Sequence, residues 1–460
     1  MIRLVLSALV LLAAAPAGAR PLVVAAHVHT VWSGGAHTPE EIGRLAAERG
    51  VDAVLLADHD LVRATWGLPP FEHLLAWRVD RPSVLARGPA AYLAEVAAAA
   101  RATGVLLVPG AEVSAHARWE GLPGDLVLRG WRRHLLLYGL ADPEAWEDLP
   151  VSGNTGRVRW DRLPWGPLAG AGLGLLVALG LWASARRPGE RRWAAGLAAV
   201  NLLGLGHLVL APAFPWPVQG PAAGRAGWAP YQAVIDHGRA HGALVVWAHP
   251  DAAPADERVG EGFAAATLRD EPYPEALVAT RGAHGFEALV AGPSPSAAAG
   301  GPWDVAAARS AAAGEAPPWG FAGQDLHRDG RAGWLGEIVL LVDAAEASWP
   351  ALRDALAAGR FTVARREPDR EVHVAWFSPA PDGASVRVRI EGTPGLEAAL
   401  TLVAAGRPVA RARVRVPDRV TLPLPPATAP RPVRLRLEGP GALRALTNPV
   451  LVPAAPPKRS

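Results

Sequence analysis

Hydrophobic runs alternate with amphipathic stretches over the first 150 residues of the chain. Four apolar runs predict buried strands, at residues 21–26, 53–57, 105–108 and 135–140. Between the first two, Thr38-Pro39-Glu40-Glu41 has the pattern of a capping box with proline at the first helical position. A second helix is predicted over residues 90–103. Alternating strands and helices are typical of an α/β fold with a parallel sheet or barrel.

The same alternation returns after residue 228. It predicts helices at 231–241 and 351–358, and strands at 243–247, 285–290 and 337–342. From residue 371 the period changes to two, as in Val433-Arg434-Leu435-Arg436-Leu437, which predicts half-exposed antiparallel strands. We therefore expect an α/β domain in two segments, 21–150 and 228–366, followed by a β-sandwich over 370–453.

The segment between these two parts carries almost no charge. Residues 165–185 and 193–216 contain no charged side chain, and a short basic turn separates them. Because about 20 apolar residues suffice to cross a bilayer, this pattern predicts a transmembrane helical hairpin over 164–216. Two buried core helices are the alternative. Arg186, Arg187, Arg191 and Arg192 in the turn favour a cytoplasmic turn and an extracytoplasmic remainder.

The N-terminus has the order of a secretory signal. Arg3 precedes an apolar run at 4–15, and small residues lead to Ala19 before Arg20. This order predicts a signal peptide over residues 1–20, with a buried first strand or helix as the alternative. Together with the hairpin, it predicts a membrane protein whose folded part lies on the periplasmic or another extracytoplasmic side.

Composition limits the chemistry that the chain can use. None of its 460 residues is cysteine, which excludes disulfides and thiolate metal sites, so His, Asp and Glu must hold any metal. The net charge is +3, and Lys458 is the only lysine. Since no basic run is present, we expect no nucleic-acid partner. The partners that we do expect are a small-molecule substrate and, through the hairpin, a membrane.

Titratable side chains recur where the predicted strands end. His27 and His29 follow the first strand, and alternate residues of a strand share a face. His134 opens a strand instead of ending one. The members of the set are His27, His29, Asp58, His59, Glu112, His134, His249, Asp325 and His327. Because the carboxyl ends of parallel strands gather on one face, we predict a divalent-metal cluster there.

These motifs resemble those of the PHP (polymerase and histidinol phosphatase) family. The resemblance covers roughly residues 21–150 and 231–448. It implies a distorted (β/α)₇ barrel, into which the hairpin is inserted. The motifs that carry it, in the family's order, are His27-Val28-His29-Thr30 with Ser33, Ala57-Asp58-His59-Asp60, Gly110-Ala111-Glu112, His134, Ala248-His249-Pro250 and Asp325-Leu326-His327.

The resemblance also implies two or three divalent metal ions, which could be manganese, zinc or iron. The implied ligand sets are His27, His29, Glu112 and Asp325 for the first ion, Glu112, His134 and His249 for the second, and His59 and His327 for the third. The implied activity is hydrolysis of phosphate monoesters or diesters by a metal-activated water. Asp58 would orient His59 or carry a proton.

One position departs from the family pattern. Ser33-Gly34-Gly35 stands where the family usually has Ser-Asp-Gly, so Gly34 offers no side-chain ligand to the third ion. His37 could replace it, although the helix cap at Thr38 favours an ordinary exposed histidine. The lost ligand leaves an alternative function, a membrane-tethered binding protein without catalysis. Since every other expected position carries His, Asp or Glu, the hydrolase is favoured.

Overall fold

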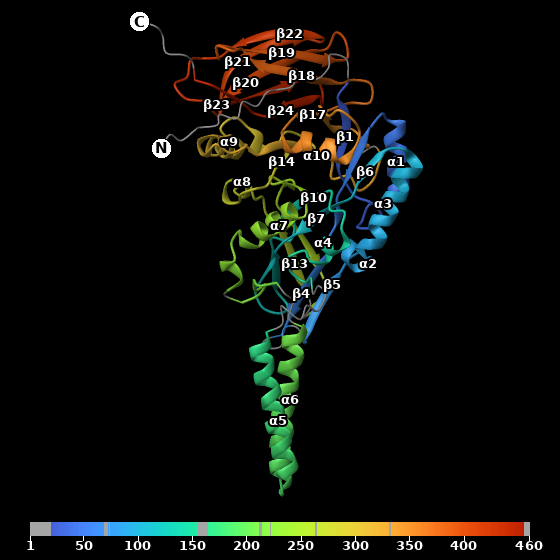
Figure 1. Ribbon diagram of the computed structural model, residues 1–460, viewed down its shortest axis with the longest axis vertical. Helices are drawn as coiled ribbons and strands as arrows, with labels where there is room; N and C mark the ends of the chain where they lie inside the picture. Colours follow the sequence, from blue (N-terminus) through green and yellow to red (C-terminus); the bar gives the residue numbers. More distant parts are fainter. Residues whose placement is uncertain are drawn as a thin grey trace, which may run out of the picture.

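The computed structural model describes residues 20–68, 72, 74–154, 164–210, 214–220, 222–262, 265–330 and 333–454. The predicted signal peptide lies outside these residues, apart from Arg20. Figure 1 shows three parts along the long axis of the molecule: a β-rich C-terminal part, a central α/β part, and a protruding pair of helices. The candidate site lies in the central part.

The first sheet of the α/β part begins with parallel strands, as predicted. Strands β1 (Leu22–Val28), β2 (Ala53–Leu56) and β6 (Leu106–Val108) pair in parallel in this order. On its other side, β1 pairs antiparallel with β16 (Ile338–Val342). Apolar side chains of all four strands are buried, because both faces of this part of the sheet are covered.

The second sheet carries most of the candidate site. Its order is β15-β14-β11-β10-β7-β3. The strands are β3 (Asp58–His59), β7 (Gly110–Ser114), β10 (His134–Tyr138), β11 (Leu244–Trp247), β14 (Gly285–Leu289) and β15 (Trp319–Ala322). Strand β10 runs antiparallel to both β7 and β11. The start of β10 therefore lies beside the ends of its neighbours, which is why His134 opens its strand and still reaches the site.

The predicted closed barrel is not shown by the strand pairing. The described strands of the α/β core belong to two separate sheets, and the chain passes from one to the other between β2 and β3 and between β6 and β7. An isolated bridge from Val28 to Leu326 adds a further link. The structure shows a mixed α/β fold, and the distorted barrel stays a prediction, because an apolar run predicts a strand and leaves its partner and direction open.

Helices cover the α/β part where the sequence predicts them. Thr38 caps α1 (Pro39–Glu48) in a reciprocal capping box with Glu41. Gly104, with φ of 70°, ends α3 (Pro89–Thr103) in the left-handed conformation that glycine adopts readily. The other helices are α2 (Val84–Arg87), α4 (Pro143–Glu147), α7 (Ala229–Ala240), α8 (Ala276–Ala279), α9 (Pro302–Ala313) and α10 (Trp349–Ala357).

The uncharged segment folds as two packed helices, α5 (Trp165–Ser184) and α6 (Pro188–Leu210), which project from the α/β part (Figure 1). Among the described residues, only α5 is long and apolar enough to cross a membrane. The prediction of two spans is therefore corrected to one candidate span. The predicted basic turn is also wrong in part, because α6 takes Glu190, Arg191 and Arg192 into its first turn. These charges make the N-terminal end of α6 polar.

Two smaller sheets were not predicted. Strands β4 (Arg63–Gly67) and β5 (Ala76–Asp80) form a hairpin. A four-stranded sheet has the order β12-β13-β9-β8, with β8 (Arg118–Glu120), β9 (Leu126–Arg129), β12 (Ala255–Val259) and β13 (Ala266–Asp270). In Figure 1, β4, β5 and β13 lie toward the helix pair. These strands have three to five residues of mixed polarity, which is too short for a periodic signal.

The C-terminal part has the predicted antiparallel strands. One three-stranded sheet joins β18 (Val372–Pro379), β19 (Ser385–Gly392) and β22 (Asp418–Pro423). The other strands of the C-terminal part belong to the ten-stranded sheet. They are β20 (Glu397–Ala404), β21 (Arg407–Arg415), β23 (Arg431–Glu438), β24 (Arg444–Thr447) and β25 (Val450–Val452). Strand β24 pairs with β17 (Phe361–Arg365), which pairs with β16. One sheet thus runs through both parts, and the predicted domain limits stay a prediction.

A buried ion pair also joins the C-terminal part to the α/β part. Arg434 on β23 donates from Nε to Asp304 Oδ1 at 2.8 Å and from Nη2 to Asp304 Oδ2 at 2.9 Å. The guanidinium of Arg434 lies 4.6 Å from the ring centre of Trp303. The C-terminal part is therefore packed on the α/β part through α9, on which both Trp303 and Asp304 lie.

Candidate metal centre

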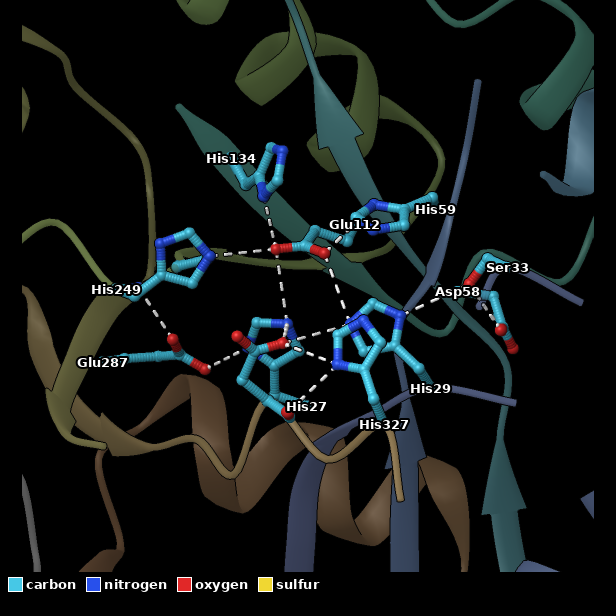
Figure 2. Close-up of polar contacts among 12 residues, drawn as sticks. His27, His29, Ser33, Asp58, His59, Glu112, His134, His249, Glu287 and His327 are labelled. Carbon is cyan, nitrogen blue, oxygen red and sulfur yellow. Dashed lines mark hydrogen bonds and ion pairs between the residues drawn. The ribbon is translucent and has the colours of Figure 1, made fainter. Parts of the chain in front are cut away.

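The carboxylate of Glu112 lies at the centre of the site (Figure 2). It projects from β7, is almost fully buried, and is surrounded by five imidazoles. The distances from Glu112 Oε1 are 2.5 Å to His134 Nδ1, 3.1 Å to His249 Nε2 and 3.3 Å to His27 Nε2. Those from Oε2 are 3.1 Å to His59 Nδ1 and 3.3 Å to His29 Nε2. Both carboxylate oxygens are thus available to bridge two cations.

Asp325 joins this cluster through backbone pairing. The amide of Leu326 donates to His27 O, and the amide of His29 donates to Leu326 O, both at 3.0 Å. This pairing sets Asp325 Oδ1 at 3.5 Å from His27 Nε2 and 3.4 Å from His29 Nε2. The ring of His327 stacks on His29 with centroids 4.1 Å apart. The structure therefore brings together all eight residues that were predicted as metal ligands.

The donor atoms form three overlapping groups, within each of which they lie no more than 4.8 Å apart. The groups are His27, His29 and Asp325; His27, Glu112 and His249; and His29, His59 and His327. They overlap with the implied ligand sets without matching them: the first lacks Glu112, the second has His27 in place of His134, and the third adds His29. His134 belongs to none of the three groups. The third group forms without a side chain at position 34.

Two buried nitrogen atoms show that the site fits a divalent cation. Nε2 of His27 and Nε2 of His29 are buried, and neither has a hydrogen-bond partner among the described residues. Buried polar atoms nearly always have a partner, and a missing one often marks an ion. Both nitrogens face Glu112 and Asp325, and imidazole and carboxylate are the donors that zinc and manganese accept.

The backbone is strained at three of the candidate ligands. His27, His249 and Asp325 have φ angles of 61°, 25° and 47°, a region that residues other than glycine rarely adopt. Such conformations cost of the order of 1–3 kcal/mol each and are concentrated at functional sites. Among the described non-glycine residues, only Ala405, with φ of 48°, shares this region with them. Three of the four positions are thus candidate ligands, which supports a binding role for them.

Glu287 is a member of the site that the sequence analysis missed. It lies on β14 with no exposed surface, and its Oε1 is 2.7 Å from His27 Nδ1. Its Oε2 accepts a hydrogen bond from the amide of His249 at 2.7 Å. An N–H on His27 Nδ1 that donates to Glu287 leaves the lone pair of Nε2 for a cation. The signal for this residue was a carboxylate inside an apolar strand, Phe286-Glu287-Ala288-Leu289.

Asp58 contacts the loop after β1, and not the ring of His59 that it was predicted to orient. Asp58 Oδ1 accepts from the amide of Thr30 at 2.9 Å and from Ser33 Oγ at 2.7 Å. Ser33 Oγ in turn lies 3.3 Å from His29 Nδ1. Asp58 therefore positions His29 through Ser33. A direct part for Asp58 in proton transfer stays a prediction.

The surrounding charges set the protonation of the cluster. Burial raises the pKa of Glu112, but the nearby histidines outweigh this and hold that pKa well below its usual range. Burial lowers the pKa of His29, but the carboxylates of Asp325 and Glu112, 3.4 and 3.3 Å from its Nε2, raise it overall, to about 9. Burial holds the pKa of His59 well below its ordinary value. Glu112 raises this pKa, but His29 and His134 lower it further. Before a metal binds, protons on His27 and His29 balance the carboxylates.

Metal binding is therefore expected to release protons. His29, with a pKa of about 9 in the metal-free protein, is protonated at pH 7, and a cation needs the neutral imidazole. The apparent metal affinity should rise with pH until about pH 9, and by up to about tenfold per pH unit for each proton displaced. Calorimetry at pH 7 in buffers with different ionisation enthalpies would count the protons. Equal heats in all buffers would contradict this expectation.

A cavity of about 380 Å³ opens onto the cluster. Its lining includes six of the candidate ligands, His59, Glu112, His134, His249, Asp325 and His327. Gly34 lines it too, and its φ of 112° would strain any other residue there. Asp60 also faces the cavity, and burial raises the pKa of its carboxyl to about 8. The remaining lining comes from residues 33, 61–62, 81–82, 114 and 131–132.

The other histidines that were considered have structural contacts. His37 was predicted as an exposed residue, but its side chain is only 27% exposed and its Nε2 accepts from the amide of Asp329 at 3.3 Å. His116 Nε2 lies 3.1 Å from Pro217 O, and His284 Nδ1 accepts from the amide of Val245 at 3.0 Å. These contacts agree with their assignment outside the cluster.

Comparison with known proteins gives distant structural relatives. No protein-family model and no curated protein matches the chain. A two-domain protein from Bacteroides vulgatus, containing a predicted PHP-like metal-dependent phosphoesterase, is 14% identical with a TM-score of 0.36, over 93% of this chain and 94% of that one. A candidate metal-dependent phosphoesterase from Bifidobacterium adolescentis is 18% identical with a TM-score of 0.33, over 75% of this chain and 98% of that one.

An amidohydrolase from Chromobacterium violaceum, with bound sulfate and no metal, is 19% identical with a TM-score of 0.30, over 67% of this chain and 88% of that one. Identity and TM-score are low in all three cases, so these likenesses carry no information on the chemistry of this chain. The chain is thus similar to two proteins described as metal-dependent phosphoesterases, one of them as PHP-like, and PHP is the family that its sequence motifs resemble.

Proposed function

We propose that the protein is a metal-dependent hydrolase of the PHP type that cleaves phosphate esters. The observation that carries this proposal is the buried carboxylate of Glu112, which lies within 3.3 Å of nitrogen atoms from five histidines. A carboxylate with both oxygens among imidazoles is suited to hold two divalent cations about 3.5–4 Å apart. Such cations, when bound, lower the pKa of water and stabilise negative charge on phosphoryl oxygens.

The chain's own residues orient the ligands and form the substrate cavity. Glu287 fixes the ring of His27, and Ser33 with Asp58 supports the ring of His29. His59 stays neutral at physiological pH because burial lowers its pKa, so it can donate a lone pair. A cavity of about 380 Å³ leaves room for a small-molecule ester and for water.

Metal analysis with a substrate panel tests this function. The purified protein should hold two or more equivalents of manganese, zinc or iron, and it should hydrolyse an aryl phosphate monoester or diester. Removing the metal with a chelator should abolish hydrolysis, and adding manganese or zinc back should restore it. Hydrolysis that survives complete metal removal would rule out the proposed chemistry. A metal-loaded protein inactive on every ester would favour the binding protein instead.

We also propose that the helix pair anchors the protein to a membrane, with the cavity on the extracytoplasmic side. The support is exposed apolar surface: Leu173, Leu176 and Trp193 are 64%, 67% and 84% exposed. Large exposed apolar surfaces mark contacts with membranes or with other proteins. The arginines at positions 186–187 and 191–192, where α5 meets α6, favour the cytoplasmic side for that end.

Cell fractionation tests the anchor. The full chain should sediment with membranes and resist extraction by high salt, since apolar insertion is insensitive to screening. Replacing residues 165–210 by a short Gly-Ser linker should move the protein to the soluble fraction with its metal content intact. A full chain that is soluble without detergent would exclude the anchor and leave the hydrolase proposal untouched.

A further inference from the structure

Two arginines share the cavity with the metal cluster. Arg81 follows β5, and Arg132 lies between β9 and β10. Both line the cavity of about 380 Å³ together with Glu112, His134 and His249. They come from the two small sheets outside the main α/β core. Among the described residues, neither arginine pairs with Glu112 or Asp325, so the two arginines are not part of the metal cluster.

One carboxylate holds both guanidinium groups. Glu257 on β12 contacts Arg81 Nη2 through Oε1, and Arg132 Nη2 lies 3.3 Å from its Oε2. Arg132 Nη1 also pairs with Asp270 Oδ2 on β13, at 3.1 Å. The arginines are thus brought to one place by a single bridging counter-ion. Each guanidinium has five N–H groups, so donors remain for a further anion.

Burial separates this arginine pair from the cluster. The side chains of His27 and His29 have no exposed surface, and that of Glu112 has 2%. Arg81 and Arg132 are 43% and 47% exposed, and Glu257 is 36% exposed. The cavity therefore has a cation-binding inner end and a guanidinium-lined outer end. A phosphoryl group that reacts at the inner end leaves the outer end for another part of the substrate.

We infer that Arg81 and Arg132 form a subsite for a second anionic group of the substrate. This inference rests on the proposed function. A guanidinium group binds phosphate or carboxylate through two parallel N–H donors. The interaction is stronger when the arginines are half-exposed than when they are fully solvated. The substrate class is then phosphate esters that carry a further phosphate or carboxylate. Glu257 is the counter-ion that keeps the pair assembled and gives up its contacts when the anion binds.

A pair of substrates tests this subsite. Phenyl phosphate carries only the group to be cleaved, and 1,4-phenylene bisphosphate carries a second phosphate. The double variant Arg81→Gln/Arg132→Gln should lose about 10- to 100-fold in kcat/KM for the bisphosphate, mainly through KM, since a charge-assisted hydrogen bond contributes about 1.5–3 kcal/mol. Its kcat/KM for phenyl phosphate should stay within about threefold. Equal losses on both substrates would overturn the proposal, as would no loss on either.

Binding of inorganic phosphate separates this proposal from the failure of the hydrolase. Calorimetry on chelator-treated protein should show phosphate binding that the double variant loses. Glu257→Gln should strengthen phosphate binding by about three- to tenfold, because the carboxylate that competes for the two arginines is removed while the fold is kept. If the ion pairs of Glu257 are only structural, this variant should bind phosphate no better than the parent. Arg269→Gln, which breaks a pair with Asp256 on the same sheet, is the matched control and should change nothing. Phosphate binding unchanged in the double variant would exclude the subsite.

Discussion

Glu112→Gln should reduce the metal affinity by about 10²–10⁴-fold and abolish hydrolysis at limiting metal. The change keeps the shape of the side chain and removes the one negative charge that lies among five imidazoles. Losing the charged partner of a buried ionic site costs about 3–5 kcal/mol, and each 1.4 kcal/mol is about tenfold in affinity. Metal content by mass spectrometry and initial rates over a range of metal concentrations measure both effects.

The controls for this variant separate charge from folding. Glu40→Gln removes a half-exposed carboxylate that pairs with Arg44 on α1, and it should leave metal content and rate unchanged. The secondary structure of Glu112→Gln, followed by circular dichroism, should match that of the metal-free parent. A folded Glu112→Gln variant that keeps its metal and its rate would contradict the role of Glu112 as the bridging ligand.

Glu287→Gln should lower the metal affinity by about 10- to 100-fold, the usual effect of losing the partner of a metal-binding histidine. Glu287 accepts from two groups, the ring of His27 and the amide of His249. A glutamine has one oxygen and one NH₂ group, so it can accept from only one of them and turns a donor toward the other. The ring of His27 is then free to rotate, which weakens a ligand that two of the three donor groups share.

A second variant checks that this effect acts through positioning. Glu287→Asp keeps the charge but shortens the side chain by one methylene, so it should fall between the parent and Glu287→Gln in metal affinity. The space is tight, because a Cβ on Gly323 would lie 1.7 Å from Glu287 Oε1, so larger side chains are unsuitable controls. Metal titration by calorimetry measures the series. Full affinity in Glu287→Gln would show that the ring of His27 needs no such support.

Much of the site could be predicted because it depends on local sequence order. His27, His29, His59, Glu112 and His249 follow apolar runs, and strand ends in an α/β fold meet at one face. Asp325 was placed by its motif, and the backbone pairing of residues 324–326 with β1 gives the physical reason. The helix cap at Thr38 was predicted for a similar reason, since it needs residues only three positions apart.

The parts that were missed depend on contacts distant in sequence. The antiparallel pairing of β10 and β16 was not predicted, because the direction of a strand is set by its partners and not by its own residues. Glu287 is 260 residues from His27, and nothing in its strand indicates that partner. The start of α6 was also missed, since the predicted turn is in part helical and α6 includes Glu190, Arg191 and Arg192, and only α5 among the described residues passes as a candidate span. Charged residues are tolerated in a first helical turn that faces water.

Anomalous X-ray diffraction from crystals soaked in manganese or zinc would test the metal cluster most directly. We predict two or more strong peaks around Glu112, each about 2.0–2.3 Å from ligand atoms, with one peak beside His27 Nε2 and His29 Nε2 and another beside His249 Nε2. Crystals that show no peak within reach of Glu112, or a single peak at an exposed site elsewhere, would contradict a metal-dependent hydrolase built on this cluster.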